Sequence, residues 1–141
     1  MPELMSVNVC SREIRSRRKI LLYGSCIETE YPEIFNQFAK GYVPLSICLE
    51  NEHMNMAGFK LLGIMRRCPP EEIRVLTVDG SPHCIQLHFM VEECLKIIGD
   101  YKGKIKHLVI ENGKVNEIEG KVVKKARYLT KIKDLMLCKA D

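Results

Sequence analysis

The sequence predicts an α/β fold: a three-layer domain built on a mostly parallel open sheet, with elements in the order β-α-β-α-β-α-β-β-α. Short apolar runs alternate with longer segments of helical periodicity, as in right-handed β-α-β units with helices on both faces of a sheet. Asn112-Gly113 lies between two runs of alternating apolar residues, which indicates a type I′ hairpin. The chain has 141 residues, enough for one domain with its own core.

The first half of the chain supplies two strands and two helices. Residues 1–18 lack regular periodicity, so we expect an N-terminal arm followed by a single domain over residues 19–141. Residues 19–23 and 42–49 are short apolar runs typical of buried strands, and Pro44 favours an edge position or a strand start. Between these runs, Pro32 and Gly41 are typical of the first turn and the end of a helix.

A second helix is expected after residue 50, because Asn51 or Asn55 can cap it and the Pro69-Pro70 pair must stop it. Its expected apolar face consists of Met54, Phe59, Leu61, Leu62 and Met65.

The second half begins with a β-branched run over residues 73–78, which predicts a third strand. Ser81 as the cap and Pro82 as the first helical residue predict a helix that runs to about residue 98, with Gly99 ending it. The hairpin occupies residues 104–118 and is followed by a basic amphipathic helix over residues 121–138. The expected inner face of that last helix consists of Val122, Ala126, Leu129, Ile132 and Met136.

Composition favours a soluble globular protein, because 46% of the residues are hydrophobic and 28% are charged. We expect no membrane span and a cytoplasmic location, since the sequence has neither a long apolar run nor a signal-peptide core. The net charge of +4 is concentrated in residues 12–19 and 121–133. Charge runs are more often solvated faces than nucleic-acid sites, so nucleic acid is not the expected partner.

Cysteine placement points to a functional site. There are seven cysteines, an odd number, which in a reducing compartment favours free thiols, metal ligation or redox chemistry. Cys26, Cys48 and Cys84 each follow a predicted strand, at the edge where parallel sheets bind ligands. His83 and His88 can complete a ligand set, and sulfur with imidazole suits zinc or an iron–sulfur cluster. The absence of any CxxC pair disfavours a zinc ribbon and a thioredoxin-type dithiol.

Two other functions stay open. In a metal-free thiol enzyme, Cys84 would be the nucleophile and His88, one helical turn later on the sheet-facing side, its base. In a non-catalytic module, the basic final helix would bind an acidic protein or RNA, or methionines would line a homo-oligomer contact. The structural alternative is that Cys84 and His88 simply fill the core. Candidate cofactor-binding residues after the strands are Gly24, Ser25, Asp79, Gly80 and Ser81, although no complete P-loop or dinucleotide fingerprint is present.

Residues 48–80 also carry a recognisable pattern. Ala57-Gly58, Leu61, Gly63, Arg66, Pro69-Pro70 and the run IRVLTVDG follow one another in this stretch. The pattern resembles the iron–sulfur domain of the delta subunit of methyl-viologen-reducing hydrogenases.

That resemblance implies an α/β topology and a cluster with two irons and two sulfides that passes electrons between a hydrogenase and a partner reductase. This chain keeps only Cys48 of the family's closely spaced pair, and it has Asp79-Gly80 where the family has another cysteine. A cluster would therefore need Cys26 and Cys84. The leading hypothesis is a small redox or metal-binding protein that acts as an accessory subunit of an oxidoreductase complex.

Overall fold

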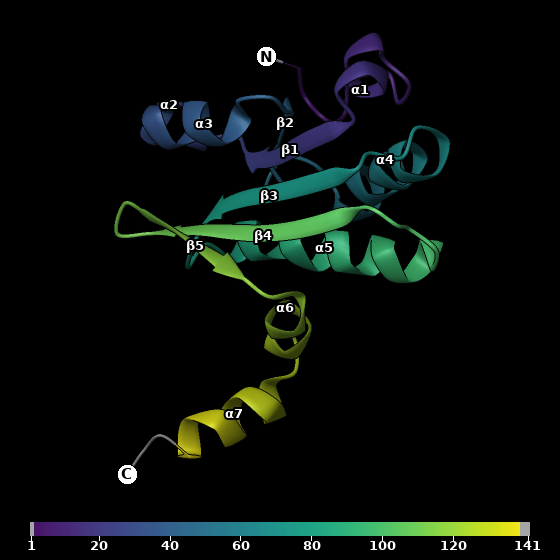
Figure 1. Ribbon diagram of the computed structural model, residues 1–141. Helices are drawn as coiled ribbons and strands as arrows, with labels where there is room; N and C mark the ends of the chain where they lie inside the picture. The colour runs from purple at the N-terminus through teal and green to yellow at the C-terminus, as the bar shows by residue number, and fades with distance from the viewer. Residues whose placement is uncertain (1, 139–141) are drawn as a thin grey trace.

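Five strands form one sheet in the computed structural model, which describes residues 2–138 (Figure 1). The strands are β1 (Lys19–Gly24), β2 (Val43–Ile47), β3 (Glu72–Val78), β4 (Lys104–Glu111) and β5 (Lys114–Ile118). They lie in the order β2-β1-β3-β4-β5; the first four are parallel and β5 pairs antiparallel with β4. The predicted mostly parallel sheet with a hairpin strand is confirmed.

Helices cover both faces of the sheet, which gives the expected three layers. They are α1 (Arg12–Arg17), α2 (Ile27–Glu30), α3 (Pro32–Ala39), α4 (Met54–Arg67), α5 (Pro82–Ile98), α6 (Gly120–Ala126) and α7 (Leu129–Cys138). On one face, Ile27 and Phe35 of α2 and α3 pack in a cluster with Leu21 of β1. On the opposite face, α4 and α5 pack in a second cluster with Leu22. Adjacent strand residues thus enter different clusters, as the alternation of a strand requires.

Local sequence signals set several element ends as predicted. The Ser81 hydroxyl caps α5 by accepting from the Cys84 N–H, and Pro82 is the first helical residue. Asn112 and Gly113 have φ values of 51° and 75°, the left-handed region that a type I′ turn requires at both central positions. Pro44 lies in β2, which is an edge strand.

The N-terminal segment corrects the expectation of an arm. Leu4 is fully buried, and its N–H donates to the carbonyl of Ser46 in β2. Ile14 of α1 is buried in the same cluster as α4 and α5. Residues 2–18 therefore pack on the domain, because Leu4 and Ile14 enter the core cluster and Met5, Val7 and Val9 pack against it.

The buried face of α4 also differs from the prediction. It consists of Ala57, Gly58, Leu61, Ile64 and Met65. Phe59, expected on that face, is 79% exposed, and Met54 is exposed as well. The cap is His53, whose Nδ1 accepts from the Asn55 N–H, and not an asparagine. The buried face is centred on Ala57, Leu61 and Ile64, and Gly58 faces α5, where Met90 and Cys94 lie beside it.

The predicted helix over residues 121–138 is wrong as a single unit. It divides into α6 and α7, and Val123, not Val122, is buried. Leu129 and Met136, expected on an inner face, are 83% and 68% exposed, and no side chain of α7 is buried. Figure 1 shows α7 standing apart from the sheet beyond α6. Within residues 2–138, no helix combines the length and apolar character that crossing a membrane requires.

Candidate functional site

The carboxyl edge of the sheet holds the point where the strand order reverses. β2 lies on one side of β1, whereas β3 and β4 lie on the other. Ligands of open α/β sheets bind outside the strands at such a point. A pocket of about 140 Å³ is found there, and we call it the thiol pocket. Its lining comes from Gly24, Ser25, Cys26, Ile47, Cys48, Leu49, Glu50, Thr77, Ser81, His83, Cys84 and Leu87.

Three thiols from three separate β-α units line this one pocket. Cys26 follows β1, Cys48 follows β2, and Cys84 lies in the first turn of α5. The Cys84 sulfur lies against the end of β1, since a Cβ placed on Gly24 would be 3.7 Å from it. The predicted neighbourhood of the three cysteines and His83 is therefore present in the structure.

The thiols also influence one another electrostatically. Cys26 is exposed, but partial desolvation raises its pKa above the ordinary value, and the nearby Cys84, Glu30 and Cys48 raise it further. Within residues 2–138, no group of three or more His, Cys, Asp or Glu side chains is placed as a metal-ligand set. The thiols thus surround the pocket without forming a closed coordination shell.

His88 does not belong to the thiol pocket, which corrects its predicted roles as ligand and as base. Its Nε2 lies 2.7 Å from Oγ1 of Thr77, and its Nδ1 lies 2.8 Å from Nδ1 of His107. Both ring nitrogens are therefore occupied, and neither is left to bind a metal or to take a proton from Cys84. These contacts were not predicted because His107 lies in β4, distant from His88 in sequence.

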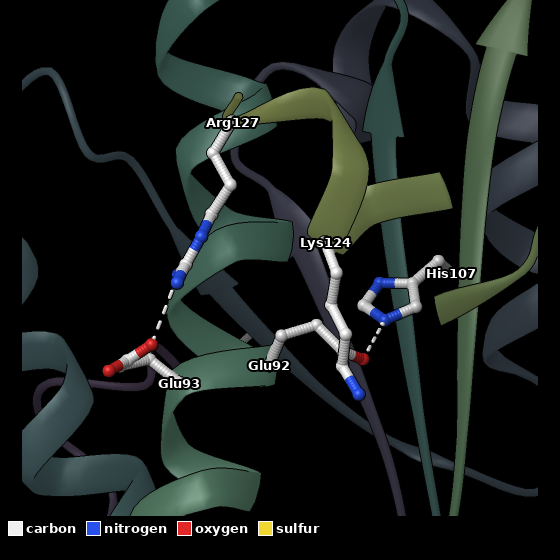
Figure 2. Close-up of polar contacts among 5 residues, drawn as sticks. All are labelled: Glu92, Glu93, His107, Lys124 and Arg127. Carbon is white, nitrogen blue, oxygen red and sulfur yellow. Dashed lines mark hydrogen bonds and ion pairs between the residues drawn. The ribbon is translucent and has the colours of Figure 1, made fainter. Parts of the chain in front are cut away.

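The contacts of His88 belong to a longer buried hydrogen-bond chain. Beyond His88, Nε2 of His107 lies 2.7 Å from Oε2 of Glu92. Thr77, His88, His107 and Glu92 are all buried, and we call them the Thr-His-His-Glu chain. Lys124 of α6, whose Nζ lies 3.9 Å from the other Glu92 oxygen, connects its far end to the surface (Figure 2).

The surrounding helices and strands shield the Thr-His-His-Glu chain from water. Burial and the neighbouring His107 lower the pKa of His88 to about 3, so its imidazole is neutral at pH 7. Gly120 at the start of α6 packs closely over Glu92, because a Cβ there would lie 3.2 Å from Oε2. Arg127, at the end of α6, forms an ion pair with Glu93 of α5, with 3.1 Å between a guanidinium nitrogen and Oε2 (Figure 2).

Sequence reasoning missed His107 and Glu92, although both carried a local signal. His107 lies between Ile105 and Val109 on one face of β4, where the alternate positions are apolar. Glu92 follows His88 by one helical turn, on the stripe that faces the sheet. A polar residue on an inward-facing position is the signal that would have identified each of them.

A second and larger pocket, of about 380 Å³, lies on the other side of the start of α5. We call it the apolar pocket. It is lined by Thr77, Val78, Asp79, Gly80, Ser81, Pro82, Ile85, His88, Val109, Ile118, Val122, Val123 and Ala126. Of the predicted cofactor-binding residues, Gly24 and Ser25 line the thiol pocket, Asp79 and Gly80 line the apolar pocket, and Ser81 lines both.

The remaining cysteines lie outside both pockets. Cys94 is buried, and its thiol donates to the Gly58 carbonyl at 3.6 Å. The thiols of Cys10 and Cys68 are hydrogen-bonded to each other, which raises the pKa of Cys68. Cys138 is exposed at the end of α7.

Comparison with known proteins gives one match. A family model described as a Rossmann-like domain matches residues 14–139, nearly the whole chain. No curated protein and no solved structure matches. The family description is one of fold, which agrees with the sheet order and with the layers of helices.

Proposed function

We propose that this chain, which belongs to the Rossmann-like domain family, is a small metal-binding accessory protein whose site is the thiol pocket. The observation that carries the proposal is that Cys26, Cys48 and Cys84 line one pocket at the point where the strand order reverses. Thiolate sulfur prefers zinc and iron–sulfur centres, and His83 offers an imidazole as a fourth donor.

Binding would require two changes in the pocket. The thiol side chains would rotate toward a common centre, since they do not form a closed shell around it. They would also lose their protons, because the thiolate is the ligand form. A bound cation would offset the mutual repulsion of three neighbouring thiolates, the effect that already raises the pKa of Cys26.

The pocket rim suits an anionic thiolate centre. Gly24, Ser25 and Ser81 line the same pocket, and backbone N–H groups that follow a strand can donate to a ligand or to sulfur. An iron–sulfur cluster is the redox form of this proposal, and the resemblance of residues 48–80 to a hydrogenase delta subunit supports it.

The proposed accessory role rests on α7, which is a candidate surface for contact with another protein. Its apolar side chains Leu129, Leu135, Met136 and Leu137 are exposed, and clusters of this kind often mark a protein contact. Lys131 and Lys133 lie on the same short helix. An oxidoreductase subunit with an acidic and apolar face is the partner that this helix fits, with a second copy of the chain as the alternative.

Metal analysis of protein purified without oxygen tests the proposed function. We expect zinc or iron in stoichiometric amount, with sulfur-to-iron absorption in the visible range if iron is present. Cys26→Ser, Cys48→Ser and Cys84→Ser should each lower the metal content, whereas Cys138→Ser, which alters an exposed thiol on α7, should not. Protein without zinc or iron, with a featureless visible spectrum, would contradict the proposal.

A further inference from the structure

The apolar pocket has a mostly apolar lining that also includes a buried, hydrogen-bonded pair of polar residues. Its volume, about 380 Å³, lies in the range of small-molecule sites. Val109, Ile118, Val123 and Ile85 supply hydrocarbon from four elements. Thr77 and His88 are buried polar residues that also line it, and they form one end of the Thr-His-His-Glu chain.

With one proton on each imidazole ring, the hydrogen bonds of that chain run in one direction. A carboxylate can only accept, so Nε2 of His107 carries a proton and donates it to Glu92 at 2.7 Å. With its single ring proton on Nε2, His107 has no proton on Nδ1, which therefore accepts from Nδ1–H of His88 at 2.8 Å. The Nε2 of a neutral His88 in turn accepts from the hydroxyl of Thr77. In this arrangement each of the three bonds contains one proton.

This direction determines what Thr77 offers to a ligand. Its hydroxyl proton is committed to His88, so the oxygen presents only lone pairs to a further partner. A ligand group near it is stabilised if it donates a hydrogen bond and is repelled if it can only accept.

We propose that the apolar pocket is a second binding site, for a small apolar molecule with a hydroxyl group that donates to Thr77. Aromatic and aliphatic alcohols are the chemical class it would select over ethers and ketones of the same size. Glu92 is a positioning residue, because it sets the donor preference from the far end of the chain without touching the ligand. The site is separate from the thiol pocket, although Thr77 and Ser81 line both.

Binding of 2-naphthol and of 2-methoxynaphthalene tests this proposal. The two probes share an apolar ring system, but only 2-naphthol can donate a hydrogen bond. Followed by fluorescence titration, the wild-type protein should bind 2-naphthol about fivefold more tightly, the effect of one net hydrogen bond. Equal binding, a preference for the ether, or no saturable binding of either probe would overturn the proposal.

Variants distinguish the contribution of the Thr77 hydroxyl to ligand binding from that of the apolar lining. Thr77→Val should remove the preference and leave the ether's affinity unchanged, whereas Thr77→Ser should keep the preference. Glu92→Gln should bring the affinity ratio toward one, because an amide can donate as well as accept and no longer fixes the direction. Ala126→Phe, which fills the pocket from α6, should weaken both probes. If Thr77→Val keeps the full preference, the hydroxyl does not recognise the ligand and the proposal fails.

Discussion

The hydroxyl of Thr77 lies 2.7 Å from Nε2 of His88, and this bond joins the end of β3 to the second turn of α5. It is the place where the two pockets meet, because Thr77 lines both of them. The same bond explains why His88 is absent from the thiol pocket. The position of His88 on α5 places it against the sheet, and there its Nδ1 is paired with His107 of β4 and not with Cys84.

Removal of the Thr77 hydroxyl should lower the free energy of unfolding. Thr77→Val keeps the shape of the side chain but leaves Nε2 of His88 buried without its donor, which costs about 1–3 kcal/mol. Urea denaturation measures the loss. Thr77→Ser, which restores the donor, should recover most of it, and an unchanged midpoint in Thr77→Val would show that the bond contributes nothing to stability.

Acid should destabilise the protein through His88. The folded-state pKa is lowered to about 3, so the unfolded chain binds a proton near pH 6.5 that the folded protein does not. Stability from this residue is therefore complete above about pH 6.5 and falls as the pH is lowered toward 3, by up to about 1.4 kcal/mol per pH unit. The groups that face His88 are Thr77, His107 and, one residue further, Glu92 with Lys124.

A comparison with His88→Gln isolates this effect from the titration of carboxylates. The wild-type protein should be the more stable of the two at pH 7, and its advantage should shrink between pH 6 and pH 4, because only the wild-type protein loses stability through this imidazole. Unfolding curves at several pH values measure the difference. A constant advantage across this range would mean that His88 is charged in the folded protein.

Two leucines should lose very different amounts of stability on the same substitution. Leu61 of α4 is fully buried, so Leu61→Ala should cost about 2–5 kcal/mol. Leu129 of α7 is 83% exposed, so Leu129→Ala should change the free energy of unfolding by less than about 0.5 kcal/mol. Thermal melts of the isolated chain compare them. A large loss in Leu129→Ala would show that α7 packs on the domain or on a second copy.

Zinc should protect a defined set of thiols from alkylation. In the presence of zinc, Cys26, Cys48 and Cys84 should react more slowly with iodoacetamide, because coordinated sulfur is no longer a free nucleophile. Cys138 is the matched exposed thiol outside the pocket, and its rate should stay the same. Mass spectrometry of peptides gives the rate at each site, and uniform protection of all four thiols would indicate non-specific binding.

Most of the fold could be predicted because its signals are local. The apolar runs of the strands, the Ser81-Pro82 start of α5 and the Asn112-Gly113 turn each depend on a few adjacent residues. The division between α6 and α7 could not be predicted, since no proline or glycine marks it. It depends on how Val123 fits against α5 and on the Arg127–Glu93 contact, both of which are tertiary.

Part of the candidate site could likewise be predicted from the sequence, and part of it depends on tertiary contacts. Cys26, Cys48 and Cys84 could be placed together from topology alone, because the ends of adjacent parallel strands lie at one edge. The hydrogen-bond chain could not, since it needs the register that brings His107 beside α5 and the packing of α6 over Glu92. Spacing in sequence predicts which residues share a helix face, but not which distant side chain completes their hydrogen bonds.

X-ray absorption at the zinc edge tests the central claim, that three thiols from separate β-α units share one ion. Protein loaded with one equivalent of zinc should show three sulfur neighbours at about 2.3 Å and one nitrogen at about 2.0 Å. In Cys84→Ser the sulfur count should fall by one. A shell of oxygen and nitrogen alone, or a spectrum that the Cys84 substitution leaves unchanged, would contradict the account.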